Sequence, residues 1–344
     1  MTDAKAALER VVREEWGRLT SLLLAQYRRL DLVEDALGDT VETAARRWPS
    51  DGTPDNPAAW LLTTARRRVL DRLRAEAMAH RKAPLLLTDA ERHQEGGRAM
   101  ADPGDLVEDD LLRLVLMCSH PALAPEAASA LSLRLVLGVS THDIARLFLV
   151  AEPTAAARIT RAKKKIIAAG IPFAVPVADM LPQRLEAVAQ TAYLAFTAGY
   201  APGSGPDLLR ADLAGEAIRL VRVVHGLQPG EPSFVALLAL MLLQHSRRDA
   251  RVDSEGRLVL LADQDRDRWH HDEIDQALQL LAAPVLAGPV SPLAASYLVQ
   301  SHIAAEHATA AAPQETRWDR IVEHYDLLLR LVPSPSARLA RAVA

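Results

Sequence analysis

The sequence lacks the features of secreted, membrane-spanning and cysteine-ligated metal proteins. It has one cysteine, Cys118, in 344 residues, which excludes a disulfide framework and a cysteine metal site. No apolar run approaches the length of a membrane-spanning helix, and the charged N-terminus contains no apolar stretch of signal-peptide length. These absences predict a cytoplasmic protein with no membrane association.

Strand-forming residues are also scarce. Aromatic residues make up 4% of the chain and runs of β-branched residues are few, whereas 49% of the residues are hydrophobic and 24% are charged. Alanine, leucine and arginine are frequent, and these residues lose little side-chain freedom in a helix. We therefore predict a globular, all-α fold, in which RLVLLA at 257–262 is the one candidate strand.

Signatures of catalysis and of bound cofactors are missing as well. The sequence contains no recognisable nucleophile motif, no glycine-rich phosphate loop and no cysteine ligand set. His302 and His307 are five residues apart, whereas two metal ligands on one helix face need a spacing of three or four. The residues therefore predict no catalytic site, no metal site and no cofactor.

The net charge of −4 argues against general binding to polyanions, but the basic residues are clustered. Five of the eight residues from Arg158 to Lys165 are basic, with no acid among them. Upstream, Pro125 and Gly138 mark the start and end of one helix. Ser140 and Asp143 fit the capping box of a second, short helix. Followed by the basic helix, these elements make a helix-turn-helix pattern, which places its last helix in the major groove of DNA.

The last helix of this pattern has two different faces. Apolar residues recur on one side at spacings of four, three and four: Ala155, Ile159, Ala162 and Ile166. At the same spacings, another side carries Thr154, Arg158, Arg161 and Lys165. One face can pack on the protein while the other contacts a phosphate backbone or base edges. A helix with a solvated basic face is the alternative interpretation.

A second basic cluster lies in residues 65–82, in a helix that begins near an aromatic residue. Its seven basic residues are Arg66, Arg67, Arg68, Arg72, Arg74, Arg81 and Lys82, and Trp60 lies at the start of the same helix. An aromatic ring beside arginines suits melted DNA, because bases stack on rings and guanidinium groups hold phosphates. A core position is the alternative for the tryptophan. Further upstream, an acidic stripe either binds a protein or complements a helix N-terminus: Asp31, Glu34, Asp35, Asp39 and Glu42.

Together these residues carry a resemblance to a known family. The stretches DLVEDALGDTVETAARRWPSDGTPDNPAAWLLTTARRRVLDRLR and HPALAPEAASALSLRLVLGVSTHDIARLFLVAEPTAAARITRAKKKI resemble regions 2 and 4 of an extracytoplasmic-function (group IV) sigma factor. YLAFTAGYAPGSGPDLLRADLAGEAIRLVR, FVALLALMLLQHSRRDAR and LVLLADQDRDRW resemble the subfamily with a long helical C-terminal extension of tetratricopeptide type. The resemblance spans nearly the whole chain.

The resemblance implies an all-helical chain with four parts. These are a region 2 module at 1–82, an acidic linker at 83–110, a region 4 helix-turn-helix at 111–170 and a helical extension at 171–344. Such proteins bind core RNA polymerase and direct it to a promoter. Transferred to this chain, Asp31, Glu34, Asp35 and Asp39 would face polymerase. Trp60, Arg66, Arg67, Arg68 and Arg72 would line the −10 element. Thr154, Arg158, Arg161 and Lys165 would contact the −35 element.

The chain also departs from the family pattern at several positions. They are Gly38, Ala155–Ala157, Thr197–Ala198 and Ala340, and the family usually continues past the position of Ala344. Because a fold does not fix a function, a second hypothesis stays open. In it, a sigma-like scaffold serves another task, as a small-molecule enzyme or a binding protein with a ligand in the C-terminal helical domain. Under the first hypothesis, the extension regulates a transcription initiation factor.

Overall fold

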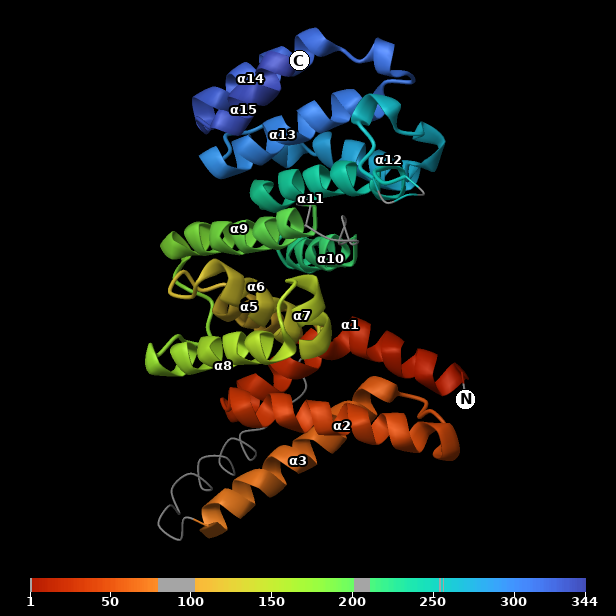
Figure 1. The fold of residues 1–344 in the computed structure, drawn as a ribbon. Coiled ribbons are helices and arrows are strands. Elements are labelled where there is room, and N and C mark those ends of the chain that lie inside the picture. The colour runs from red at the N-terminus through yellow and green to blue at the C-terminus, as the bar shows by residue number, and fades with distance from the viewer. Residues whose placement is uncertain (1, 80–102, 201–210, 254, 256) are drawn as a thin grey trace. The chain divides into compact units, whose positions relative to one another are not determined.

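The computed structural model describes the chain except residues 1, 80–102, 201–210, 254 and 256. The predicted linker therefore lies outside the described residues from 83 to 102. The described chain divides into two compact units (Figure 1). The first comprises residues 1–146 and 150–181, and the second comprises residues 147–149 and 182–344.

Both units are built from helices, and the described residues contain no strand. The first unit has α1 (Thr2–Tyr27), α2 (Leu30–Asp51), α3 (Pro57–Ala79), α5 (Pro103–Cys118), α6 (Pro125–Leu135), α7 (Thr141–Leu147), α8 (Glu152–Ala168) and a 3₁₀ turn at Ala178–Met180. The second has α9 (Leu181–Tyr200), α10 (Ala211–Leu227), α11 (Pro232–His245), α12 (His271–Leu281), α13 (Pro292–Thr309), α14 (Trp318–Leu331) and α15 (Pro335–Val343). Its 3₁₀ turns are Arg248–Ala250, Leu261–Asp263, Arg266–Arg268, Pro284–Leu286 and Pro313–Glu315. The predicted all-α fold is confirmed.

Local capping chemistry sets several helix starts, among them the predicted capping box of Ser140 and Asp143. The Asn56 side chain accepts from the Ala59 backbone N–H at 3.0 Å, directly before Pro57 opens α3. The Ser140 hydroxyl accepts from the Asp143 N–H at 3.0 Å and donates to the Asp143 carboxylate at 2.6 Å. These contacts satisfy backbone donors that the first helical turn leaves unpaired.

In the first unit, α1, α2 and α3 enclose a core of large apolar side chains, and α1 also packs on α5. Leu23, Val33 and Leu61 are almost fully buried where the three helices meet. Trp16 on α1 is 4% exposed and donates its indole N–H to the Arg134 carbonyl of α6 at 3.0 Å. The helices of the predicted region 2 and region 4 modules thus share one compact unit.

Two glycines permit this close packing. A Cβ atom at Gly17 of α1 would lie 2.4 Å from the Val136 carbonyl oxygen. A Cβ atom at Gly138 would lie 2.6 Å from the Trp16 ring, and Gly138 has a φ of +73°, a conformation that suits glycine. Any side chain at either position would push the two helix groups apart.

The second unit is a stack of helices centred on α11. This helix is apolar all round and buried along nearly its whole length, as expected of a helix covered on every side. It packs against α10, α12 and α13, and α13 in turn packs against α14 and α14 against α15. Stretches with proline or glycine at 229–232, 284–292 and 333–335 separate these helices or begin the next one.

Some expectations were wrong in detail. The predicted linker ends in helix, because α5 begins at Pro103, before the predicted boundary of 110. Instead of a strand at 257–262, the structure has an isolated bridge between Val252 and Leu258. The proline at position 49 does not end α2, which runs through Pro49 to Asp51. None of the described helices combines the length and hydropathy needed to cross a membrane.

Candidate nucleic-acid interface

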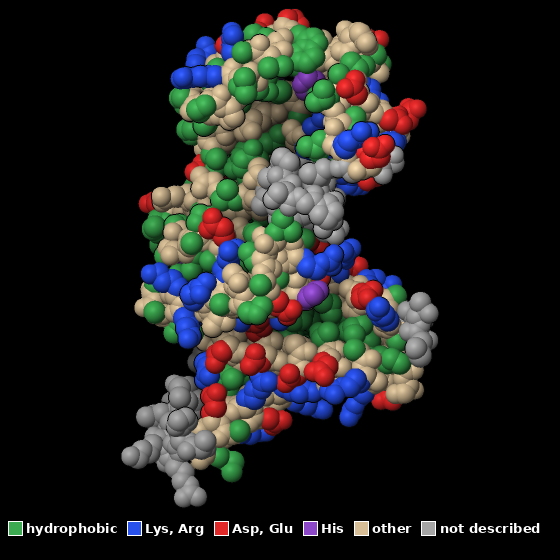
Figure 2. All heavy atoms as spheres, in the orientation of Figure 1, with side chains coloured by type: hydrophobic (Ala, Val, Ile, Leu, Met, Phe, Trp, Pro, Cys, Tyr) green, Lys and Arg blue, Asp and Glu red, His purple; other side chains and the backbone are tan. Residues whose placement is uncertain are grey.

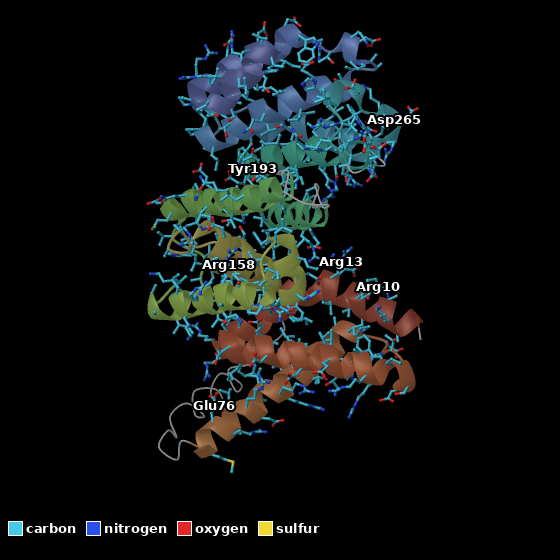
Figure 3. The ribbon with its side chains drawn as sticks, viewed as in Figure 1. Arg10, Arg13, Glu76, Arg158, Tyr193 and Asp265 are labelled. Carbon is cyan, nitrogen blue, oxygen red and sulfur yellow. The ribbon has the colours of Figure 1, made fainter. Side chains whose placement is uncertain are left out.

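Helix α8 has the two faces that its sequence predicts. Its buried residues are Ala155, Ile159, Ala162 and Ile166. Thr154, Arg161 and Lys165 are exposed, and Arg158, labelled in Figure 3, is half-buried. The apolar face fixes the helix on the unit while the opposite face presents hydroxyl and cationic groups to solvent.

The exposed face of α8 is strongly basic. Figure 2 shows Lys and Arg side chains gathered over this helix. Among the described residues, Arg161 and Lys165 have no acidic partner, so their charge is available to an outside anion. A helix with this charge at the end of a helix-turn-helix suits the phosphates that flank a major groove.

The basic cluster of α3 is partly neutralised within the unit. Arg66 and Arg67 are exposed, whereas Arg68 and Arg72 are half-buried against α2. Arg72 lies 2.7 Å from a carboxylate oxygen of Asp39 and 3.3 Å from one of Asp35. Acidic and basic side chains accordingly lie side by side over α2 and α3 in Figure 2.

The second arginine of this pair makes two contacts with α2. Arg68 donates to the Thr43 hydroxyl at 2.7 Å and lies 3.6 Å from Asp39. Arg66, Arg67 and Arg74 are therefore the exposed arginines of α3, while Arg68 and Arg72 are held by residues of the neighbouring helix.

Trp60 lies at the start of α3 beside a second tryptophan. Its ring meets that of Trp48 edge to face, with centroids 5.6 Å apart. Trp60 is partly buried, and both rings line a cavity of about 350 Å³. The other lining residues are Arg47, Asp51, Gly52, Thr53, Pro54 and Asp55. The indole N–H of Trp48 is buried with no hydrogen-bond partner in the described structure.

The acidic residues of α2 are in different surroundings. Asp31 and Asp35 are exposed, and Asp39 is half-exposed. Asp31 accepts from Arg29 at 2.9 Å, and this hydrogen bond lowers the pKa of the Asp31 carboxyl. Arg29, directly before α2, also donates to Glu76 of α3 at 3.1 Å, so it links the start of α2 to α3.

Glu34, by contrast, is buried, with 8% of its side chain exposed. Its carboxylate accepts from Arg134 of α6 at 2.8 Å and forms an ion pair with Lys163 of α8. Burial by itself raises the pKa of Glu34, but the two cations outweigh it, so the pKa lies below its ordinary value. Glu34 is therefore an ionised carboxylate inside the unit.

Sequence reasoning did not single out Arg134, Lys163 or Trp48. Lys163 lies within the predicted basic cluster, but its position between the two helix faces gave no reason to separate it from its neighbours. Arg134 follows an apolar run of α6, and a lone arginine there indicates a buried partner only once the acid is known. Contacts between residues a hundred or more positions apart leave no local signal.

The second unit contains a cavity of about 780 Å³. Its walls come from α9, α11, α13, α14 and α15, and they include Tyr193, Tyr297, Tyr325, Gln300 and Arg251. Tyr193, labelled in Figure 3, donates its hydroxyl to the Gln300 side chain at 3.1 Å, and its ring lies 5.2 Å from that of Tyr297. Burial raises the pKa of both hydroxyls, so they are neutral at physiological pH.

Comparison with known proteins shows which families match parts of this chain. The family models for sigma-70 region 2 and for sigma-70, region 4 match residues 11–78 and 113–166. A family of unknown function, DUF6596, matches residues 184–284. An uncharacterized protein of Rhizobium meliloti (strain 1021), R00370, is 43% identical over 322 residues, covering 94% of this chain and 75% of that protein. No solved structure matches the chain.

A helix-turn-helix with an exposed basic helix, packed beside a second basic helical module, defines a DNA-binding protein. The chain belongs to the extracytoplasmic-function sigma factors that carry a C-terminal extension. The two sigma regions support a role in transcription initiation and imply binding to core RNA polymerase and promoter DNA.

Proposed function

We propose that α8 reads the −35 element, that α3 contacts the −10 element and that α2 binds core RNA polymerase. The observation that carries this assignment is the division of α8, whose apolar face is buried while Thr154, Arg161 and Lys165 face solvent. Only an anchored helix holds side chains firmly enough to select one base sequence. Arg158, on the same side of the helix, completes the proposed contact set.

On the −10 side, the cavity beside the two tryptophans is the proposed place for an unstacked base. Trp60 offers a ring for stacking, and the unpartnered Trp48 N–H offers a donor that a base acceptor would satisfy. Arg66 and Arg67 are exposed on the same helix and would hold the backbone phosphates. The cavity thus favours single-stranded over double-stranded DNA.

A binding assay with two forms of DNA tests this assignment. With core polymerase present, Trp60→Ala should weaken binding to DNA with a melted −10 segment by about tenfold or more, since base stacking contributes about 1–3 kcal/mol. Binding to the same duplex without a melted segment should change little. Arg46→Ala is the matched control, because Arg46 is an exposed residue of α2 outside the cavity. Equal losses on both DNAs would show that Trp60 has only a structural role.

On the polymerase side, Asp31, Asp35 and Asp39 are the expected polymerase-binding residues that reach the surface of α2, and they complement a basic partner. The role also requires a cytoplasmic location, where polymerase acts. The proposed domain limits are those of the sequence: region 2 at 1–82, linker at 83–110, region 4 at 111–170 and extension at 171–344.

The extension is proposed to regulate the sigma regions. Its helices make their own core around α11, so it is built as a separate unit that can respond to a signal. A chain that ends at residue 181 should still bind core polymerase, with an affinity that differs from the full chain. Identical affinity and identical transcription from the two chains would argue against a regulatory extension.

A second candidate function is binding of a small molecule, which the large cavity of the extension favours. A volume of about 780 Å³ with tyrosine walls and a few polar groups suits an aromatic ligand. Arg251 would pair with an anionic group of that ligand. The fluorescent probe anilinonaphthalene sulfonate has both features and should bind saturably. Leu194→Arg, at the exposed rim, should abolish this binding, whereas Leu260→Arg, exposed and outside the cavity, should not. Equal binding by both variants would remove this candidate.

A further inference from the structure

Three residues from two sigma regions meet in one buried ion-pair cluster. Glu34 belongs to α2 of region 2, while Arg134 and Lys163 belong to α6 and α8 of region 4. The exposed fractions of the three side chains are 8%, 19% and 22%. Ion pairs with this burial are much less screened by solvent and salt than pairs on the surface.

The surrounding contacts hold the same two regions together. The Arg134 guanidinium lies 5.7 Å from the centre of the Trp16 ring of α1, and within region 4 one of its terminal nitrogens donates to the Val139 carbonyl at 3.3 Å. Gly17 and Gly138 leave no room for a side chain at this contact. The cluster therefore lies at a closely packed interface between region 2 and region 4.

This placement conflicts with the role proposed for Glu34. A carboxylate that faces polymerase must be accessible, yet here region 4 covers it. We propose that Glu34, Arg134 and Lys163 form an autoinhibitory latch, which closes region 4 over part of the polymerase-binding helix until polymerase displaces it. The inference rests on the proposed function, because it takes α2 as the polymerase-binding element.

The remaining acids show how such a latch opens. Asp31 and Asp35 stay exposed in the closed state, so a basic polymerase surface can bind them before Glu34 is released. Polymerase then gains the Glu34 carboxylate only in the open state, and a partner that binds one state better shifts the population toward it. Arg161 and Lys165 are exposed while the latch is closed, so the latch masks the polymerase side and leaves the DNA side accessible.

The single cysteine of the chain offers a direct probe of opening. Cys118 of α5 is fully buried, and it lies close enough to Glu34 that the carboxylate adds to burial in raising the pKa of the thiol. Because α5 packs on α1, separation of the two regions would expose it. The rate at which iodoacetamide alkylates Cys118 in the full-length protein therefore reports the open fraction.

Lys163→Met is the principal variant, with Lys164→Met, an exposed neighbour on α8, as its control. We expect Lys163→Met to raise the alkylation rate by about tenfold or more, since loss of one partner weakens a buried pair, and Lys164→Met to stay within about twofold of the parent chain. Glu34→Gln should act like Lys163→Met, because each removes the ion pair between Glu34 and Lys163. The double variant should add little to either single variant. Control-level rates in both single variants would overturn the latch.

Dilute urea separates opening from global unfolding. Alkylation through the latch should accelerate with urea much less steeply than unfolding of the whole chain, because separation of two regions exposes less surface. A slope equal to that of global unfolding in every variant would also overturn the proposal.

The affinity of each variant for core polymerase is the second measurement, and it tests whether the latch is autoinhibitory. Lys163→Met should bind core polymerase about tenfold more tightly, in step with its larger open fraction, and Lys164→Met should match the parent chain. Faster alkylation without tighter binding would reject the autoinhibitory role while retaining the contact. If no form of the chain binds polymerase, the proposed function fails, and the alkylation rates still decide whether the regions close.

Discussion

Arg72 of α3 donates to the Asp39 carboxylate of α2 across 2.7 Å. One of these residues was assigned to promoter DNA and the other to polymerase, yet in the free chain each is the partner of the other. The side chains are 32% and 44% exposed, so the pair adds little to stability, typically less than about 1 kcal/mol. The ion pair matters because it competes with binding: Arg72 and Asp39 must separate before either can bind an outside partner.

Replacing Asp39 separates the two proposed roles. Asp39→Asn should leave Arg72 paired only with Asp35 and Arg68 bonded only to Thr43, which strengthens DNA binding at low salt by a few-fold, and should weaken binding to core polymerase. Fluorescence anisotropy with labelled DNA and with labelled polymerase measures both. Glu42→Gln, on an exposed position of the same helix, should change neither. A parallel loss of both affinities would indicate that Asp39 only supports the fold.

The basic face of α8 should dominate binding to duplex DNA. Replacing Arg158 and Arg161 by alanine should lower affinity by about tenfold or more and reduce the salt slope by about two units, if each arginine neutralises one phosphate. Arg330→Ala with Arg338→Ala removes the same charge from exposed positions of the extension and serves as the control. An unchanged salt slope in the α8 variant would mean that this helix does not contact the backbone.

Two glycines in neighbouring helices should respond in opposite directions to the same substitution. Gly17→Ala forces a methyl group to 2.4 Å from the Val136 carbonyl oxygen and should destabilise the first unit by about 1–3 kcal/mol. Gly38→Ala meets nothing within 4 Å inside α2 and should stabilise it by about 0.5–1 kcal/mol. Urea unfolding of each variant measures the difference. Destabilisation by both would show that the space around Gly38 is needed.

The extension should lose stability in mild acid. Burial, together with the nearby charges of Arg247 and Arg266, lowers the pKa of His307 to about 4. The folded state thus takes up its proton at lower pH than the unfolded state, whose histidine titrates near 6.5. This contribution is fully present above about pH 6.5 and is lost as the pH falls toward 4, amounting to about 1–2 kcal/mol for a partly exposed ring.

Hydrogen exchange of α13 and α14, corrected for the intrinsic effect of pH, would reveal this loss. His307→Gln should flatten the difference in protection between pH 7 and pH 5, whereas His271→Gln, outside this packing, should preserve it. The His307 ring packs edge to face on that of Trp318, with centroids 5.3 Å apart. The fluorescence of Trp318 therefore gives a second measurement of this packing. An undiminished pH response in His307→Gln would assign the effect to other groups.

Local chemistry made much of the fold predictable. Helix periodicity located the buried stripe of α8 residue by residue, Pro125 marked the start of α6, and Ser140 with Asp143 marked the start of α7, because these signals act within a few positions. In α14, Ile321 and Leu328 are the buried residues, because packing on α13 and α15 sets the rotation of the helix.

The candidate site was predictable only in part. Residue type identified the basic and acidic clusters, but it could not show that Asp39 pairs with Arg72 or that Glu34 is buried beneath region 4. These contacts depend on which helices meet in space, and the same charges would face solvent in another packing. The cavity of the extension likewise joins residues from Gln190 to Ala340, which no local pattern connects.

Transcription from genomic DNA would show directly whether the chain directs core RNA polymerase to promoters. Core RNA polymerase would be incubated with sheared genomic DNA, with and without the full-length chain, and the 5′ ends of the transcripts sequenced. The account predicts discrete start sites that need the chain, share two upstream sequence elements and disappear with the double alanine variant of Arg158 and Arg161. Transcripts that are identical with and without the chain, under conditions where it is folded, would contradict the account.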